Sequence, residues 1–450
     1  MRLRFLRITV VLLVLLGLPL GLWRLYLAHV INREMSVIRE AGLPTNGEEL
    51  NRWYAAVPDR QNAALVLTQA FALRRVFPDS RSNLIFNFKL PARTESLSPE
   101  PIELLRGYLA LNEARLRKAE EALRLPASRF PMDCRQLMNA PLPHLAWLKE
   151  LGELHQYAAY VEMASGNISL AASNMVTMLA LARTLDNEPC LISQLVRLKL
   201  LGMAFETLER RANAGAFDAM ELSALVGAFT QTRITNVVAR ALIGERAMTL
   251  PYFRMTRAEQ ARISPPRPDS EPKHDSPLPC HGPAILRLIG YYELDFGSYL
   301  IGMNKAITLL SNAPPSNLRA SAYFARVGEA STERRRTLSG MTFSSYAGSM
   351  WRENQGVAHQ RLALTAFAVE SFRNETGRLP EKLEELAPKY FEEVPEDPFT
   401  GLELAYRRTE KGYVIYSVGP DRTDNGGLGK ADKKQSDDKK SYDITFTVER

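Results

Sequence analysis

The C-terminal stretch of residues 377–427, together with residues 442–448, constrains the fold of this 450-residue chain most strongly. Turn residues, alternating apolar residues and helix signals agree more closely there than anywhere else in the chain. Three runs are bounded by turn residues: the first and the last alternate between apolar and polar residues, as half-buried strands do, and the middle one follows a predicted hairpin turn at Lys411-Gly412. The runs are residues 402–407, 413–417 and 444–448. The stretch therefore predicts a small antiparallel sheet of three strands.

Two helices are expected beside this sheet. Pro380 suits the first position of a helix because its fixed φ angle is already helical, and Pro388 would end that helix. Apolar side chains repeat with helical spacing between Leu364 and Phe372, which predicts an amphipathic helix over residues 357–374. Three strands alone are only marginally stable, so we expect the second helix to cover the sheet.

The order of these segments resembles the C-terminal region of the major pseudopilin of type II secretion systems. The shared motifs are ETGRLPEKLEEL, VPEDPFTG, YVIYSVGPDRTDNGG and SYDITF, all in the last fifth of the chain. The whole chain also resembles bacterial membrane-anchored proteins that end in this tail, a resemblance that implies no activity. The leader of type IV pilins, a Gly-Phe junction followed by a Glu inside an apolar segment, is missing. Its absence argues against assembly into a pseudopilus.

The resemblance implies a calcium site in the loop before the last strand. In the family, one carboxylate follows a Gly-x motif and another precedes the final strand, and these positions match Asp421 and Asp443. Asp424 is a third candidate without a firm counterpart, and Arg422 stands where the family has Gly. From Asp421 to Arg450, seven acidic residues face seven basic ones, so no net negative charge attracts a cation. A solvated polar loop is the alternative.

The N-terminus predicts a membrane anchor. An uncharged, mostly apolar run covers residues 8–23 and is flanked by Arg7 and Arg24. The run is shorter than the roughly 20 residues that span a bilayer, but flanking arginines can extend to the interface. A cleaved signal peptide is the alternative, although no clear small-x-small site follows the run. We therefore expect residues 1–30 to be an uncleaved signal anchor in a bacterial inner membrane, with the bulk of the chain in the periplasm.

Charge and cysteine content argue against two classes of protein. Of the formal charge of +7, residues 1–40 supply +4, because six arginines face two glutamates there. The remainder is nearly balanced and has no basic run interleaved with aromatic residues, so we expect no nucleic-acid partner. Cys134, Cys190 and Cys280 are too few and too scattered for a disulfide framework or a zinc site. We expect unpaired thiols, with one disulfide as the alternative.

Residues 31–350 predict an antiparallel helical domain between the anchor and the tail, residues 351–450. Seven prolines crowd into residues 261–283, which we expect to form a mobile loop, and residues 339–348 are expected to be irregular. Apolar periodicity and turn residues predict helices over residues 48–55, 63–75, 98–125, 145–164, 168–185, 189–212, 219–231, 234–250 and 284–310. The fold class is mainly α, with a small C-terminal α+β module.

Few residues of this helical domain indicate a chemistry. His144 and His155 fall on one helix face but about 16 Å apart along its axis, too far to share a metal. Glu245 and Arg246 lie in an apolar helix and predict an internal ion pair, with one half of a site as the alternative. The sequence contains no Gly-rich phosphate loop, nucleophile elbow or His-Glu-x-x-His motif.

Two classes of function therefore compete. The first is a non-catalytic envelope protein, a scaffold or interaction protein whose tail contacts partner proteins. The second is an enzyme with a site around Glu245, covered by the Pro-rich loop. The absence of catalytic motifs favours the first class, whereas a pocket of converging titratable groups around Glu245 would favour the second.

Overall fold

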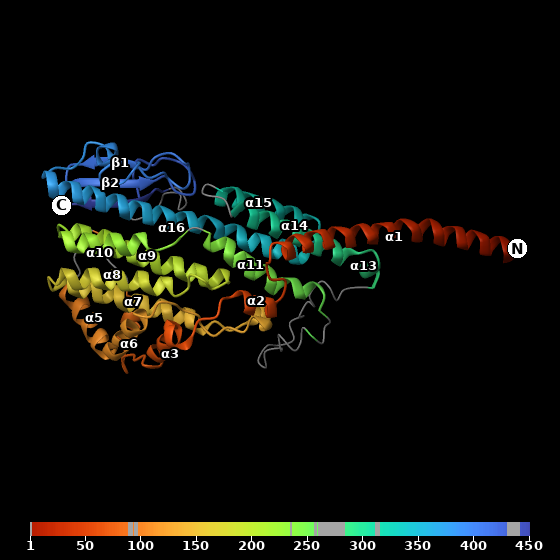
Figure 1. Cartoon of the computed structure of the whole chain (residues 1–450), viewed down its shortest axis with the longest axis horizontal. Coiled ribbons are helices and arrows are strands. Elements are labelled where there is room, and N and C mark those ends of the chain that lie inside the picture. Colours follow the sequence, from red (N-terminus) through yellow and green to blue (C-terminus); the bar gives the residue numbers. More distant parts are fainter. Residues whose placement is uncertain are drawn as a thin grey trace.

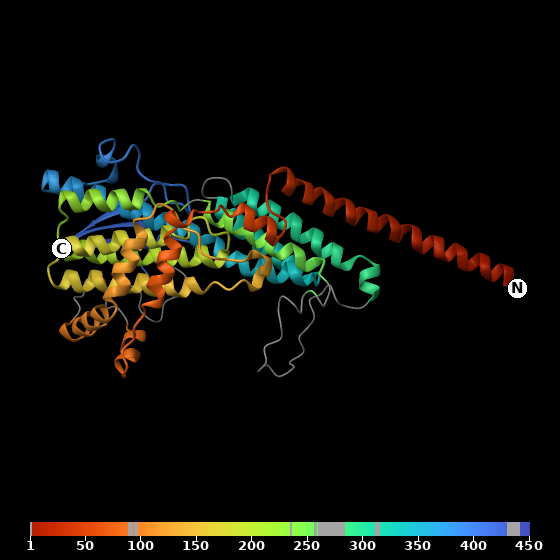
Figure 2. The same ribbon diagram turned by 60° about the horizontal axis from the view of Figure 1, so that its bottom comes forward.

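The computed structural model describes residues 2–88, 93, 98–234, 236–255, 259, 284–310, 316–429 and 442–450. It confirms a mainly helical fold with a small three-stranded antiparallel sheet near the C-terminus. Most long helices run along one axis, and the sheet lies against one side of them (Figure 1). The N-terminal helix leaves the opposite end of this body (Figures 1 and 2). The expected Pro-rich loop lies outside the described residues.

Helix α1, Arg2–Glu40, has two parts with different surroundings. Its second part packs against α14, Tyr291–Leu310, and buries Leu27 and Ile31. Its first part projects away from the body as a lone helix (Figures 1 and 2). Leu18, in this projecting part, is 64% exposed.

The expected membrane anchor falls on the projecting part of α1. The side chains of residues 1–14 and 16 lie outside the described part of the chain. Among the residues that the structure describes, no helix has both the length and the apolar character that crossing a membrane requires.

The helices of the body follow the predicted order, and those from α7 to α11 agree closely with their predicted segments. One predicted helix, residues 98–125, is divided at Asn112, which is buried and exchanges hydrogen bonds with the backbone of Arg75. The helices are α2 (Gly47–Trp53), α3 (Ala63–Ala72), α4 (Arg81–Phe86), α5 (Pro99–Leu111), α6 (Glu113–Leu123), α7 (Pro143–Ala164), α8 (Ile168–Arg183), α9 (Leu191–Ala214), α10 (Ala219–Thr230) and α11 (Val237–Thr249). The 3₁₀ turns η1 (Asp59–Gln61), η2 (Cys134–Asn139) and η3 (Leu250–Phe253) lie between them.

A second predicted helix, residues 284–310, is also divided, into α13 (Ala284–Leu288) and α14. The chain turns between them at Gly290, whose φ angle of +76° suits glycine. A Cβ atom there would also approach the Leu27 side chain to 2.6 Å, so glycine lets α1 pack closely at this turn.

The prediction of an irregular segment at residues 339–348 is wrong. These residues lie inside α16, Thr337–Thr376, which packs along α15, Ser316–Glu333. Their small side chains weaken helix propensity but permit close packing, since a Cβ atom on Gly340 would lie 2.9 Å from Thr332. Tertiary packing against α15 therefore sustains a helix that the local composition disfavours.

The sheet consists of β1 (Ala405–Thr409), β2 (Gly412–Ser417) and β3 (Ile444–Glu449), in the order β1-β2-β3. Both neighbouring pairs are antiparallel, as predicted. The helix expected from Pro380 to Pro388 is wrong, because only a 3₁₀ turn forms there: η5, Leu383–Leu386. Lys382, which precedes η5, is extended with φ −151° and ψ 158°, so no helix continues from Pro380.

The sheet and the helices share one core. The covering helix α16 contacts β2 and β3, as expected, and β3 also contacts α9. Phe446 of β3 packs edge-on against Phe205 of α9, with ring centroids 5.5 Å apart. Glu209 accepts the backbone N–H of Thr447, and Asn213 accepts that of Glu449. The tail is therefore joined to the helical body by both apolar packing and polar contacts.

Candidate functional site around Glu245

The candidate site lies where α11 meets the connection between α8 and α9. Gly244 packs directly on the backbone of Pro189, because a Cβ atom on Gly244 would lie 1.8 Å from the Pro189 carbonyl oxygen. Only glycine permits so close an approach. The contact brings the next residue, Glu245, to the first turn of α9, which begins at Leu191.

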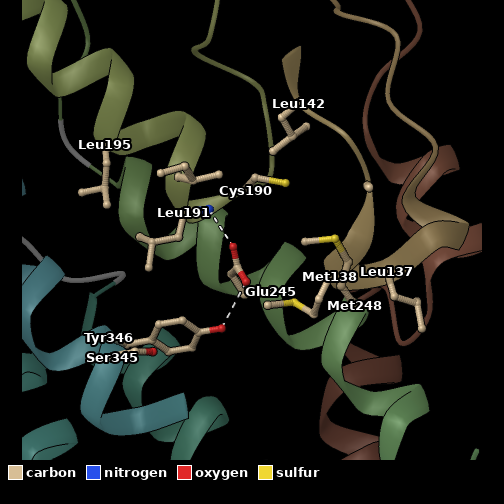
Figure 3. A pocket seen from close by; sticks show the side chains of 12 residues that line it. Leu137, Met138, Leu142, Cys190, Leu191, Leu195, Glu245, Met248, Ser345 and Tyr346 are labelled. Carbon is tan, nitrogen blue, oxygen red and sulfur yellow. Dashed lines mark hydrogen bonds between the residues drawn. The ribbon is translucent and has the colours of Figure 1, made fainter. Parts of the chain in front are cut away.

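Glu245 is buried, and both of its carboxyl oxygens are hydrogen-bonded (Figure 3). Its Oε1 accepts the backbone N–H of Leu191 at 2.8 Å, and its Oε2 accepts the Tyr346 hydroxyl at 3.1 Å. Burial raises the pKa of the Glu245 carboxyl, and the two hydrogen bonds oppose that shift without cancelling it. The environment therefore favours the neutral carboxylic acid more than water does.

The Glu245 carboxyl lies in the wall of a pocket of about 280 Å³, which we call the Glu245 pocket (Figure 3). Most of the side chains that line it are apolar. The lining residues are Leu137, Met138, Ala140, Leu142, Cys190, Leu191, Ile192, Leu195, Glu245, Met248, Ser345 and Tyr346. Small-molecule sites are usually about 300–1,000 Å³ and combine apolar walls with a few polar groups. The Glu245 pocket suits a small, mainly apolar molecule.

The predicted ion pair between Glu245 and Arg246 does not form. Successive residues of a helix point about 100° apart, so adjacent side chains do not face each other. Arg246 instead donates from Nη1 to Asn304 Oδ1 at 2.7 Å. Burial lowers the pKa of Arg246 to about 10. Within the described part of the chain, no ion pair reaches Glu245, which leaves its carboxyl without a compensating cation.

Two thiols lie at or near the pocket, and neither is prepared as a nucleophile. Cys190 lines the pocket and Cys134 lies in the adjoining core; both are buried and unpaired, as expected. Burial raises the pKa of the Cys134 thiol to about 11 and that of Cys190 further. The thiolate is the reactive form of cysteine, so these environments disfavour nucleophilic chemistry. Cys280 lies outside the described residues.

A buried polar cluster behind the pocket was not predicted from the sequence. His144 of α7 lies against Glu188, with its Nε2 atom 2.9 Å from Oε1, and the Ser193 hydroxyl donates to that same oxygen at 2.6 Å. Phe130 stacks on the His144 ring. All three polar side chains are buried, so the cluster fixes the connection between α8 and α9. In the sequence, Glu188 is one of two acids in the Asp186-Asn-Glu-Pro189 break, and no local pattern links it to His144, 44 residues away.

The second histidine singled out from the sequence has a separate environment. His155 lies about three turns further along α7 than His144, and its Nδ1 atom is 2.9 Å from Asn174 Oδ1. Burial lowers the pKa of His155 to about 4. His144 and His155 therefore have different hydrogen-bond partners.

The tail carboxylates occupy the loop between β2 and β3. Asp443 is buried and accepts the backbone N–H groups of Asn425 and Gly427 at 3.2 and 2.7 Å. Burial raises the pKa of Asp443, and the charge of Asp424 raises it further, while the two backbone hydrogen bonds oppose the shift. Asp421 is exposed and accepts the N–H of Thr423 in its own turn. Among the described residues, no three His, Cys, Asp or Glu side chains are arranged to hold a metal ion.

Comparison with known proteins returned no match among family models, curated proteins or solved structures. The chemistry of the site therefore rests on its own geometry. The described lining of the Glu245 pocket offers one carboxyl that favours its neutral form and the hydroxyls of Tyr346 and Ser345, without a histidine or an activated thiol. The Ser345 hydroxyl donates to the Thr342 carbonyl at 2.8 Å. Such a site can orient an apolar ligand through one or two hydrogen bonds, but it lacks a nucleophile and base in contact.

Proposed function

We propose that the chain is a single-pass protein of the bacterial inner membrane whose periplasmic body acts by binding rather than by catalysis. The observation that carries this proposal is the N-terminal apolar run between Arg7 and Arg24, which α1 continues as a lone helix leaving the body (Figure 2). Exposed leucines on a solitary helix are costly in water and stable in lipid. Trp23, at the end of the run, suits the boundary between lipid and water.

The tail supplies the second part of the proposal. Its resemblance to the major pseudopilin supports a role as an interaction module for other envelope proteins. The same resemblance supports calcium binding by Asp421 and Asp443, with Asp424 as the weaker third candidate. The nearly balanced charge of the chain after residue 40 argues against a nucleic-acid partner.

Protease digestion of spheroplasts tests the membrane topology of the full chain. Protease added from outside should degrade everything beyond about residue 28, and the remaining fragment should resist extraction by alkaline carbonate. Leu15→Arg places a charge within the apolar run at a cost of about 2.5–3.5 kcal/mol for insertion, so it should release the chain. Met220→Arg, at an exposed site on α10, should leave the chain in the membrane. Protection of the C-terminus would contradict this topology.

The Glu245 pocket favours a second candidate, an enzyme that uses Glu245 as a general acid. The supporting observation is a buried carboxyl with a raised pKa in a pocket wall, an environment that active sites often provide. Tyr346 and Cys190 are the other titratable groups among the described lining residues, and burial raises the pKa of both, so neither is prepared to act as a base. The binding function is therefore preferred, and an activity lost in Glu245→Gln without loss of ligand affinity would reverse that preference.

A further inference from the structure

Helix α13 lies at the end of the body from which α1 emerges (Figures 1 and 2), and a second group of exposed apolar side chains belongs to it and to the residue that follows it. Ile285, Leu288 and Ile289 are 59%, 58% and 43% exposed, respectively. Their i, i+3, i+4 spacing places them on one face of the chain at α13. Single exposed apolar residues are ordinary on protein surfaces, but a contiguous group marks a place of interaction.

Helix α1 extends this apolar group. Trp23 and Tyr26 stack with ring centroids 5.8 Å apart, and both rings are exposed. Leu22 and Leu25, in the same turn of α1, are 61% and 68% exposed. Aromatic residues beside aliphatic ones are typical of the zone where a membrane meets water.

Polar contacts fix the position of α13 relative to α1. The Trp23 indole N–H donates to the Ile289 carbonyl at 2.9 Å, and Arg24 donates to the Arg287 carbonyl at 2.9 Å. Arg24 also forms an ion pair with Glu293 of α14 at 2.7 Å. The exposed face of α13 is therefore fixed beside the turn of α1 at which the apolar run ends.

We propose that α13 and the Trp23–Tyr26 turn form one docking surface that lies in the headgroup region of a phospholipid bilayer. This inference rests on the proposed membrane anchor, because α1 would deliver the docking surface to the bilayer. Three features favour lipid over a protein partner: continuity with the apolar run, the stacked aromatic pair, and the exposed, cationic Arg287 beside them. The surface would hold the body close to the membrane in one orientation.

Site-directed fluorescence on the full chain tests the proposal. Cys280→Ser removes the third thiol, while Cys134 and Cys190 are buried, so Leu288→Cys and Ile285→Cys provide single reactive sites for an environment-sensitive dye. Met220→Cys, on an exposed apolar residue of α10, is the matched control. Each labelled protein is reconstituted into vesicles of phosphatidylcholine and phosphatidylglycerol, with and without lipids that carry a quencher just below the headgroup.

We expect the dyes at positions 285 and 288 to shift to shorter wavelength and to lose most of their emission to the quenching lipids. The dye at position 220 should show neither change. If α1 resists carbonate extraction while the dyes on α13 emit as in water, the docking surface is refuted and the anchor stands. If carbonate releases the chain and vesicles still quench the dyes on α13, the anchor fails and the docking surface stands. Release of the chain with dyes that remain in water refutes both.

Discussion

Two buried glutamates, each bonded to a tyrosine hydroxyl, lie in different parts of the body. Glu245 accepts the Tyr346 hydroxyl at 3.1 Å, and Glu370 of α16 accepts the Tyr413 hydroxyl of β2 at 2.9 Å. The second pair is joined by Arg450, whose guanidinium forms an ion pair with Glu370. Glu370 therefore has a compensating cation, whereas Glu245 has a backbone N–H and a pocket beside it.

The difference separates a structural role from a binding role. A buried carboxylate with an arginine partner fastens the sheet and the chain terminus to α16, because separating the charges would leave one of them unpaired in the core. A buried carboxyl without a cation is shifted toward its neutral form, which can donate as well as accept a hydrogen bond. Glu245 retains that capacity at the wall of an apolar pocket.

The largest loss of stability is expected when Glu370 loses its arginine partner. Within the described part of the chain, Glu370 would then be a buried acid without a cation, as Glu245 is. Arg450→Met leaves a buried charge unpaired, which should destabilise the fold by about 3–5 kcal/mol at neutral pH. Arg408→Met removes one partner of the exposed ion pair with Glu381 and should cost at most about 1 kcal/mol. Thermal unfolding of the full chain compares the two, and equal losses would refute a structural role for Arg450.

Calcium should distinguish the tail from the Glu245 region, since it would stabilise the tail and leave the Glu245 region unchanged. An ion that binds only the folded chain stabilises it by about 2.7 kcal/mol at a hundredfold excess over Kd. We expect a chelator to lower the unfolding midpoint of the wild-type protein and to have no effect on Asp443→Asn. An unchanged wild-type midpoint on chelation would leave the loop between β2 and β3 as a solvated surface.

The approach of α11 to the start of α9 can be tested with two glycines in helices. Gly244→Ala forces α11 away from Pro189 and should destabilise the fold by about 1–3 kcal/mol. Gly202→Ala, in α9, meets no atom within 4 Å and should stabilise the fold by about 0.5–1 kcal/mol. Opposite shifts in melting temperature are expected. A neutral Gly244→Ala would show that the contact does not position Glu245.

The smallest expected effect is the pH dependence of stability that Glu245 causes. Burial raises the pKa of Glu245 in the folded chain. At a pH between the pKa of the unfolded chain and that of the folded chain, Glu245 is therefore protonated when folded and ionised when unfolded. Stability therefore falls as pH rises from the unfolded pKa, about 4.3, through the folded one. The glutamine in Glu245→Gln does not titrate. The melting temperature of this variant, relative to that of the wild type, should therefore increase as pH rises. Glu381→Gln is the surface control, and a difference that does not vary with pH would contradict the raised pKa.

Local sequence patterns predicted much of the fold, but packing between distant segments decided the rest. Helices α7 to α11 follow apolar periodicity interrupted by turn residues such as Gly166, so their order could be inferred. The start of α16 could not, since its small residues become helical only against α15. Glu245 was a candidate from its apolar setting, but its partners Leu191 and Tyr346 lie 54 and 101 residues away. No local pattern reveals such contacts.

The most direct test of a binding role for the Glu245 region is titration of the full chain with the apolar fluorescent probe N-phenyl-1-naphthylamine. Saturable binding to the wild type and to the surface variant Met220→Trp is expected. Ala140→Trp, which fills the Glu245 pocket, should weaken binding at least about tenfold, or about 1.4 kcal/mol, without lowering the melting temperature. Equal affinity in Ala140→Trp and the wild type would contradict a binding site at Glu245.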